Sequence, residues 1–166
     1  MARNCVSIIF PDSGQIYAPS YVVSSGGAAT IAAGSPTKST SVGAVVPMVD
    51  ADGTTSQKFA GIAKNDSTDT AAAAGAVNVY APYLSLVYAC KAKTAALANT
   101  AALIAALCFK RVVFDLTATG GTWTIDTAAA NAATNGVVIV GGDAPSATIY
   151  FTISPQITVF DNPTTA

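Results

Sequence analysis

The chain has 166 residues, of which only 10% are charged, and a net charge of −1; its nine acids are all aspartates, with no glutamate or histidine. Eight dispersed lysines and arginines exclude a nucleic-acid-binding protein, which needs concentrated cations, and they serve a membrane surface equally poorly. The absence of histidine excludes Ser-His-Asp and Cys-His nucleophiles and histidine metal sites. We therefore expect a protein that is not an enzyme, holds no metal and needs no cofactor.

Residues 1–41 are predicted to form either an extended N-terminal arm or the first strands of the main domain. The region contains Pro11, Pro19 and Pro36 and the Gly26-Gly27 pair. Its short apolar pieces lie between these residues and follow no single period. Both alternatives remain open from the residues alone.

From residue 42 onward the sequence is typical of an all-β protein, and we predict a small β-barrel or sandwich over 42–166. Short β-type runs alternate with turn residues about every ten residues. The runs are Val42 to Val49, Phe59 to Ala63, Ala76 to Tyr80, Leu84 to Cys90, Arg111 to Leu116, Thr122 to Ile125, Val137 to Val140, Thr148 to Ile153 and Ile157 to Phe160. Turns are predicted at Asp50 to Gly53, Gly120-Gly121 and Gly141-Gly142, and a polar loop at Asn65 to Thr70.

One segment departs from this pattern and predicts a short helix at about 100–109. Apolar residues recur there at spacings of three and four, at Leu97, Ala101, Ile104 and Cys108. Asn99 or Thr100 is expected to cap the N-terminus. The run is too short to span a membrane, which takes about 20 apolar residues.

Half of the cations flank this helix, at Lys91, Lys93, Lys110 and Arg111. They could meet an acidic partner, but solvated charges beside an apolar helix are the more ordinary interpretation. Cys5, Cys90 and Cys108 are odd in number and lack Cys-x-x-Cys spacing, which indicates reduced, buried thiols in a chain folded in a cytoplasm. A bond between Cys90 and Cys108 is the alternative.

Three other patterns have a chemical and a plain interpretation. Asp50-x-Asp52-Gly53 resembles the opening of a calcium loop, but the chain lacks the later bidentate glutamate, so an ordinary turn is favoured. Asp66 and Asp69 predict a solvated loop rather than an acid–base pair. Trp123 shares a strand face with Ile125, which favours a core position over a binding platform.

The order of the runs carries a resemblance. A first strand ends at Val49-Asp50 and is followed by Lys58-Phe59-Ala60-Gly61-Ile62-Ala63 and Val77-Asn78-Val79-Tyr80-Ala81-Pro82. Val112-Val113-Phe114-Asp115 and Gly136 to Pro145 come later. Over roughly 42–153 this order resembles the head decoration, or capsid cement, proteins of tailed bacteriophages. The helix and the N-terminal arm have no counterpart there.

The resemblance implies a structural virion protein that catalyses no reaction and binds the outer surface of an assembled capsid. It implies trimers that stabilise contacts between subunits of the major capsid protein, on the virion surface after synthesis in the host cytoplasm. Several weak contacts suffice in such a lattice. We expect capsid or subunit contacts in the arm, at Arg3, Val6, Ile8, Ile9 and Phe10. The alternative is a carbohydrate-binding or adhesive β-sandwich on a virion or cell surface, which would use an exposed Trp123 and exposed tyrosines.

Overall fold

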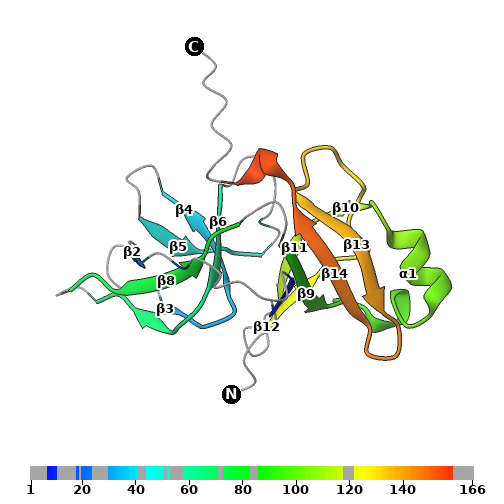
Figure 1. The fold of residues 1–166 in the computed structure, drawn as a ribbon, viewed down its shortest axis with the longest axis horizontal. Helices are drawn as coiled ribbons and strands as arrows, with labels where there is room; N and C mark the ends of the chain where they lie inside the picture. Colours follow the sequence, from blue (N-terminus) through cyan, green and yellow to red (C-terminus); the bar gives the residue numbers. More distant parts are fainter. Residues whose placement is uncertain are drawn as a thin grey trace, which may run out of the picture.

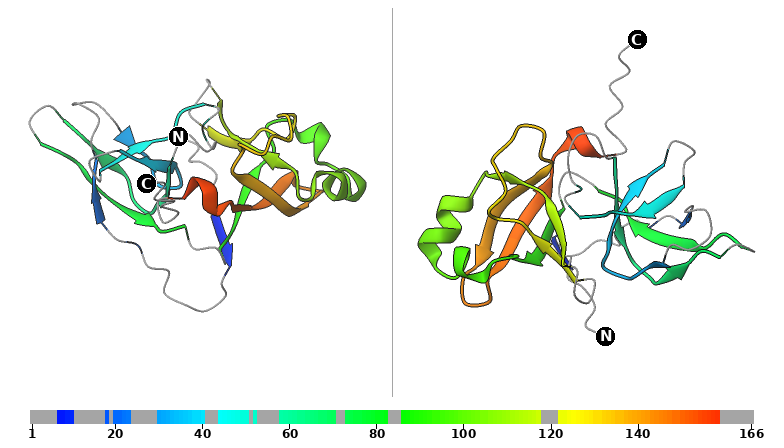
Figure 2. Two further views of the ribbon diagram at one scale, coloured as in Figure 1. Left: turned by 90° about the horizontal axis from the view of Figure 1, so that it is seen from above. Right: turned by 180° about the vertical axis from the view of Figure 1, so that it is seen from behind.

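The computed structural model describes residues 7–10, 18, 20–23, 30–40, 44–50, 52, 58–70, 73–82, 86–117 and 122–158. The protein is all-β with one short α-helix, as predicted. Its strands form two lobes that lie side by side (Figures 1 and 2). We call residues 20–82 the N-lobe. The C-lobe contains residues 86–158 together with β1 (Ser7–Phe10).

The N-lobe is a small barrel. Its antiparallel sheet has the order β2-β8-β6-β4-β5. These strands are β2 (Ser20–Val22), β4 (Pro36–Ser39), β5 (Val45–Pro47), β6 (Phe59–Ala63) and β8 (Ala76–Tyr80). Val23, just after β2, forms a parallel bridge with Val45 in β5, so the two outer strands meet and the sheet closes. A separate pair, β3 (Thr30–Ile31) and β7 (Ser67–Thr68), lies in the same lobe.

Gly61 allows the barrel strands to approach each other. Its φ is +139°, and a Cβ built on it would lie 2.0 Å from the carbonyl oxygen of Tyr80 in β8. The Gly61 carbonyl also accepts a hydrogen bond from the Thr37 hydroxyl at 2.9 Å. Because backbone occupies the position of a side chain, only glycine fits here without a shift of β8.

The C-lobe combines a five-stranded antiparallel sheet, in the order β1-β9-β14-β13-β10, with a hairpin of β11 and β12. The strands are β9 (Val87–Lys91), β10 (Arg111–Val112), β11 (Phe114–Thr117), β12 (Thr122–Ile125), β13 (Val137–Asp143) and β14 (Thr148–Ile153). Ala92, directly after β9, bridges in parallel to Ile125. This bridge ties the hairpin to the sheet.

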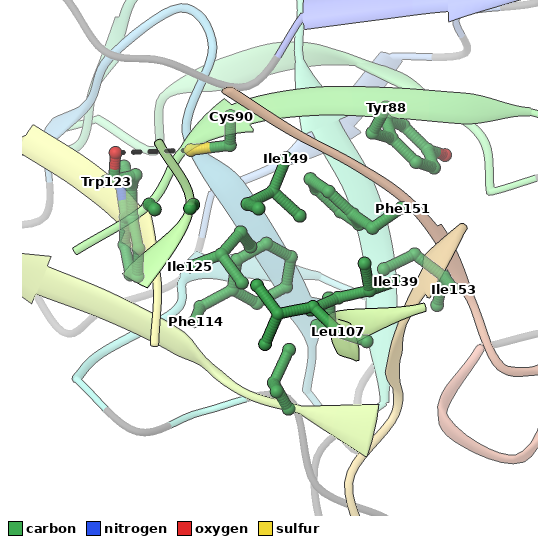
Figure 3. Close-up of a cluster of buried hydrophobic side chains, with 14 of the residues drawn as sticks. Tyr88, Cys90, Leu107, Phe114, Trp123, Ile125, Ile139, Ile149, Phe151 and Ile153 are labelled. Carbon is green, nitrogen blue, oxygen red and sulfur yellow. Dashed lines mark hydrogen bonds between the residues drawn. The ribbon is translucent and has the colours of Figure 1, made fainter. Parts of the chain in front are cut away.

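Aromatic side chains fill the space between this sheet and the hairpin (Figure 3). The Phe114 ring lies edge-on to Trp123 at 6.1 Å and to Phe151 at 5.8 Å between centroids. Trp123 is only 3% exposed, so its predicted core position is confirmed. The Cys90 thiol donates to the Trp123 carbonyl at 3.3 Å. Cys90 and Cys108 are both thiols, and the alternative of a bond between them is wrong.

Side chains of the N-lobe complete this core. Phe59, in β6, lies 6.3 Å from the Tyr88 ring and 6.0 Å from the Phe114 ring. Met48 and Ile62 belong to the same buried cluster. Phe59 also forms a parallel bridge with Thr158 at the end of the C-lobe. The two lobes therefore share one apolar core.

Asp50 and Asp52 form a polar junction between the lobes. The buried Asp52 carboxylate accepts from Lys38 Nζ and from the Val49 amide, each at 2.7 Å. The Asp52 carbonyl accepts from the Phe114 amide at 3.0 Å, and the Asp50 carboxylate accepts from the Leu116 amide at 3.3 Å. These aspartates therefore fasten β11 to the N-lobe.

The predicted helix is confirmed as α1 (Ala101–Leu107), shorter than the expected 100–109. Thr100 is the N-cap, and its hydroxyl accepts from the Leu103 amide at 3.2 Å. Ile104 and Leu107 are buried, whereas Leu97 and Ala101 of the predicted apolar stripe are exposed. The prediction of an apolar stripe is wrong at these two positions. Ala101 is only the first residue of α1, and Leu97 lies before the helix, in the 3₁₀ turn η1 (Ala95–Leu97).

Three predictions of turns, loops or strands are wrong. Gly141 and Gly142 lie within β13 rather than in a turn. A Cβ on Gly142 would lie 2.6 Å from the Thr148 carbonyl and 2.7 Å from Ile104 Cδ1, so this glycine admits α1 close to the sheet. Segment 65–70 contains β7, and Ile157 ends the 3₁₀ turn η2 (Pro155–Ile157) instead of beginning a strand.

The N-terminal 41 residues contribute strands to both lobes. β1 pairs with β9 in the C-lobe, whereas β2, β3 and β4 belong to the N-lobe. β4 pairs with β5 and β6, so the described residues on either side of position 41 form one sheet. Cys5, Gly53 and the Gly120-Gly121 pair lie outside the described residues.

Candidate contact surfaces

The contact residues predicted from the sequence fall partly in β1. Ile8, Ile9 and Phe10 lie in this strand, and Arg3 and Val6 lie outside the described residues. β1 pairs along one edge with β9, and the register shifts between Ile8 and Phe10, as at a β-bulge. β1 is the terminal strand of its sheet, so its other edge has no strand partner in the described chain. An edge strand of this kind is a template for a strand from another chain.

The opposite edge of the sheet, β10, is covered by side chains. The Arg111 amide donates to Asn131 Oδ1 at 2.9 Å, and Asn135 Nδ2 donates to the Arg111 carbonyl at 3.3 Å. These two asparagines occupy backbone groups that a further strand would need. The two edges of the C-lobe sheet therefore differ, and β1 is the better candidate for strand addition.

The four cations around the helix hold the chain together at separate points. Lys91 Nζ donates to the Ser146 carbonyl at 2.5 Å, and Lys110 Nζ donates to the Thr127 carbonyl at 2.6 Å. Arg111 Nη1 lies 3.3 and 3.4 Å from the carbonyls of Ala133 and Asn135, which precede β13. The interpretation as plainly solvated charges is therefore incomplete. Whether they meet an acidic partner stays a prediction.

Lys93 is the centre of a small charged cluster. Its Nζ lies 2.5 Å from Asp115 Oδ2 and 3.8 Å from Asp126 Oδ2. The hydrogen bond to Asp115 raises the pKa of Lys93 above its ordinary value. Thr124 Oγ1 also donates toward the Asp115 carboxylate at 3.4 Å. The amine is thus kept protonated, which suits an ion pair and not a nucleophile.

Asp66 and Asp69 lie in different environments. Asp66 is exposed and accepts from the Ala33 amide at 2.8 Å. Asp69 is only 6% exposed, so the prediction of a solvated loop is wrong for this residue. In the part of the chain that the structure describes, no three metal-ligating side chains come together.

Among the described residues, the tryptophan and the tyrosines are buried or half-buried. The carbohydrate-binding alternative used an exposed Trp123 and exposed tyrosines, and the Trp123 ring is buried in the C-lobe core. Tyr88 is buried as well, and the half-buried tyrosines are Tyr21, Tyr80 and Tyr150. Lys64 Nζ lies 5.9 Å from the centre of the Tyr80 ring, so a cation already covers one of these rings.

Sequence reasoning missed Phe109. It was taken as the last residue of the predicted helix, but it lies in the turn after α1 and is 80% exposed. The other large apolar residues that are exposed in the described chain are Val22, Val49, Leu97 and Val140. Phe109 lies just after the C-cap of the helix, a position that glycine commonly occupies, and this position is the signal that could have indicated it.

Comparison of the chain with protein-family models, curated proteins and solved structures gives no match. Among the described residues, no helix is long and apolar enough to cross a membrane.

Proposed function

We propose that this protein is a capsid decoration protein, which binds the outer surface of an assembled capsid and stabilises contacts between major capsid subunits. The observation that carries the proposal is that two of the segments on which the resemblance to decoration proteins rests pair with each other. Residues 58–63 and 77–82 provide β6 and β8, which pair through Ile62 with Tyr80 and Ala63 with Val79. The two segments are therefore parts of one barrel rather than unrelated β-type runs.

The open edge of β1 supports a way of docking. A strand of the major capsid protein that lies along this edge would form main-chain hydrogen bonds. Ile8, Ile9 and Phe10 lie in β1 and would accompany that contact. Each contact can be weak, because several copies tethered to one lattice raise the effective concentration of the remaining contacts. A trimer on the virion surface, which the resemblance implies, remains part of the proposal.

The test is co-sedimentation of the purified protein with capsid shells assembled without it. We expect the protein to saturate the shells at a fixed stoichiometry. Deletion of residues 2–10 removes β1 and should lower the occupancy at least tenfold. The matched control is Val22→Ser, which changes an exposed apolar residue of the N-lobe and should leave occupancy unchanged. Fluorescence of the buried Trp123 checks that each variant is folded.

Three results would overturn or narrow this proposal. Wild-type protein that stays in the supernatant at every concentration contradicts the decoration function itself. Absence from shells together with binding of the wild-type protein to a glycan array would favour the adhesive alternative. Full occupancy after the deletion would instead leave decoration in place and exclude β1 as the docking element.

A further inference from the structure

Asn135 and Gly136 lie directly before β13 and form the one Asn-Gly pair of the sequence. Asparagine followed by glycine is the pair most prone to deamidation, because glycine has no side chain to hinder attack of its backbone nitrogen on the asparagine amide. Both residues are buried in the folded chain. A reactive sequence therefore occupies a protected position.

Packing requires the glycine of this pair. A Cβ built on Gly136 would lie 2.3 Å from Cδ1 and 2.4 Å from Cγ1 of Ile157. Ile157 is fully buried and belongs to the C-lobe core, so it cannot easily move aside. The Gly136 carbonyl also accepts a hydrogen bond from the Ser154 amide at 2.7 Å. The fold thus excludes the larger residue that would slow the attack.

The side chain of Asn135 is held away from reaction by hydrogen bonds. Its Nδ2 donates to the Ala130 carbonyl at 2.9 Å and to the Arg111 carbonyl at 3.3 Å. Attack at Cγ requires Nδ2 to break both bonds as it departs. It also requires water to carry the proton, and Asn135 is only 8% exposed. The reaction therefore needs a local or global opening of this part of the chain.

We propose that Asn135-Gly136 is a deamidation site that folding protects and unfolding exposes. The Gly136 nitrogen bonds to Asn135 Cγ, its proton passes through water to Nδ2, and the Cγ–Nδ2 bond breaks to release ammonia. A second water then opens the five-membered imide at one of its two carbonyls. Opening at Cγ gives aspartate, and opening at the main-chain carbonyl gives isoaspartate, in which the chain continues through Cβ and Cγ. This inference does not rest on the decoration function.

Neither product fits the folded chain. Aspartate has no N–H to donate, so the carbonyls of Ala130 and Arg111 would lose their donor and face a negative charge. Isoaspartate adds a methylene group to the main chain directly before Gly136, whose position is fixed by Ile157. Chains modified while unfolded should therefore refold poorly, and unfolding becomes irreversible with time.

The test compares the folded full chain with the same chain held in urea, at one temperature and one mildly alkaline pH. Deamidation of the peptide that contains Asn135 is measured by mass spectrometry after digestion. We expect it to be at least about tenfold slower in the folded chain, because only opened molecules react. Asn78, which precedes the β-branched Val79, is the control in the same digest and should react slowly in both states.

A second measurement tests the cost of the modification. Chains returned from urea after increasing times should regain the fluorescence of buried Trp123 in proportion to the unmodified Asn135 that remains. Asn135→Asp should melt at a lower temperature than the wild type. Asn131→Asp is the matched control, because it keeps the oxygen that accepts from the Arg111 amide and should melt like the wild type.

The rate comparison needs no variant, so it decides the proposal even where Asn135→Asp fails to fold. Faster reaction in urea, with modified chains absent from the refolded fraction, supports the proposal. Equal rates in the folded chain and in urea would overturn the protection by folding. Complete refolding of chains that carry the modification, or an Asn135→Asp variant as stable as the wild type, would overturn its consequence.

Discussion

The two lobes are stabilised in different ways. Among the described residues, the N-lobe barrel encloses a separate cluster of seven buried apolar residues, none of them aromatic. The cluster of the C-lobe has 21 described buried residues, which include five aromatic rings, and three members come from the N-lobe. Because burial of apolar surface is the main stabilising contribution, the shared C-lobe cluster carries most of the stability. The barrel depends on strand closure and on its attachment to that cluster.

β6 is the strand through which this attachment operates. All five of its residues are buried, so it lacks the alternation of a half-exposed strand. Phe59 and Ile62 belong to the C-lobe cluster, whereas Ala60 and Ala63 belong to the N-lobe cluster. The large side chains thus lie on one side of the strand and the small ones on the other. β6 therefore gives large side chains to the larger core and small side chains to the smaller one.

The largest expected effect follows from removing the ring that joins the lobes. Phe59→Ala should lower the free energy of unfolding by about 3–5 kcal/mol, because it leaves a cavity between Tyr88 and Phe114. Urea unfolding followed by Trp123 fluorescence measures this loss. The control is Val77→Ala in the separate N-lobe cluster, for which a smaller loss is expected. Equal losses would contradict the difference between the lobes.

The barrel is tested by Gly61→Ala. We expect a loss of about 2–4 kcal/mol, because the added methyl group would meet the Tyr80 carbonyl and φ is positive. Hydrogen exchange should accelerate in β6 and β8 more than in β13 and β14. Gly141→Ala is the matched control, since its Cβ would meet only Tyr150 Cδ2 at 3.8 Å. Equal acceleration in both lobes would show that the barrel does not open by itself.

Tyr88→Phe tests the C-lobe core in the opposite direction. The Tyr88 hydroxyl is buried without a hydrogen-bond partner among the described residues, so its removal should raise the free energy of unfolding by about 1 kcal/mol at neutral pH. Burial also raises the pKa of Tyr88 far above its usual range. Urea unfolding at neutral pH measures the first effect. An unchanged or lower stability would contradict it.

The same variant changes the alkaline pH dependence. Above about pH 10, Tyr88 loses its proton in the unfolded chain but keeps it in the folded chain. The free energy of unfolding of the wild type should therefore fall as the pH rises. The raised pKa of Lys93 acts with the same sign, because the protonated amine pairs with Asp115 only in the folded chain. Tyr88→Phe should flatten part of this slope, and Lys93→Met a smaller part. Unfolding measured between pH 8 and 11 separates the two contributions.

The smallest effect is expected at the end of the C-lobe. Thr100→Ala removes the cap of α1 and should destabilise the protein by about 1 kcal/mol or less, since only one turn depends on it. Faster hydrogen exchange of the Leu103 amide measures this local change. Thr100→Ser keeps the accepting hydroxyl and should behave like the wild type. A change that spreads to the exchange of β14 would show that α1 supports the whole core.

Local signals in the sequence predicted the elements well where polar residues or prolines bound the runs. Residues 59–63, 76–80, 122–125 and 148–153 form strands with the predicted limits. Thr100 was predictable as a cap because capping depends on a neighbouring amide. Gly142 was misleading, since its role is set by Ile104 and Thr148, which approach it only in the folded chain.

The pairing of strands that are far apart in the chain could not be predicted from the sequence. The bridge of Val23 to Val45, which closes the barrel, and the pairing of β1 with β9 join residues that share no local pattern. Of the candidate contact residues, the sequence indicated those in β1 but not Phe109. An apolar residue after a helix is ordinarily assigned to the core, and only the positive φ and the exposed ring distinguish it.

The pairing of β1 with β9 has a consequence for synthesis. The partner strand of β1 begins at Val87, about eighty residues after Ser7 in the chain. Ser7 therefore leaves the ribosome well before its partner strand is synthesised. The N-lobe strands between them can pair with one another during that interval, at synthesis rates of about 5–20 residues per second. β1 must wait several seconds without its partner and then cross to the later lobe. The pairing of β1 with β9 is therefore a late event that joins residues far apart in the sequence. Until it occurs, nascent chains on neighbouring ribosomes can exchange β1.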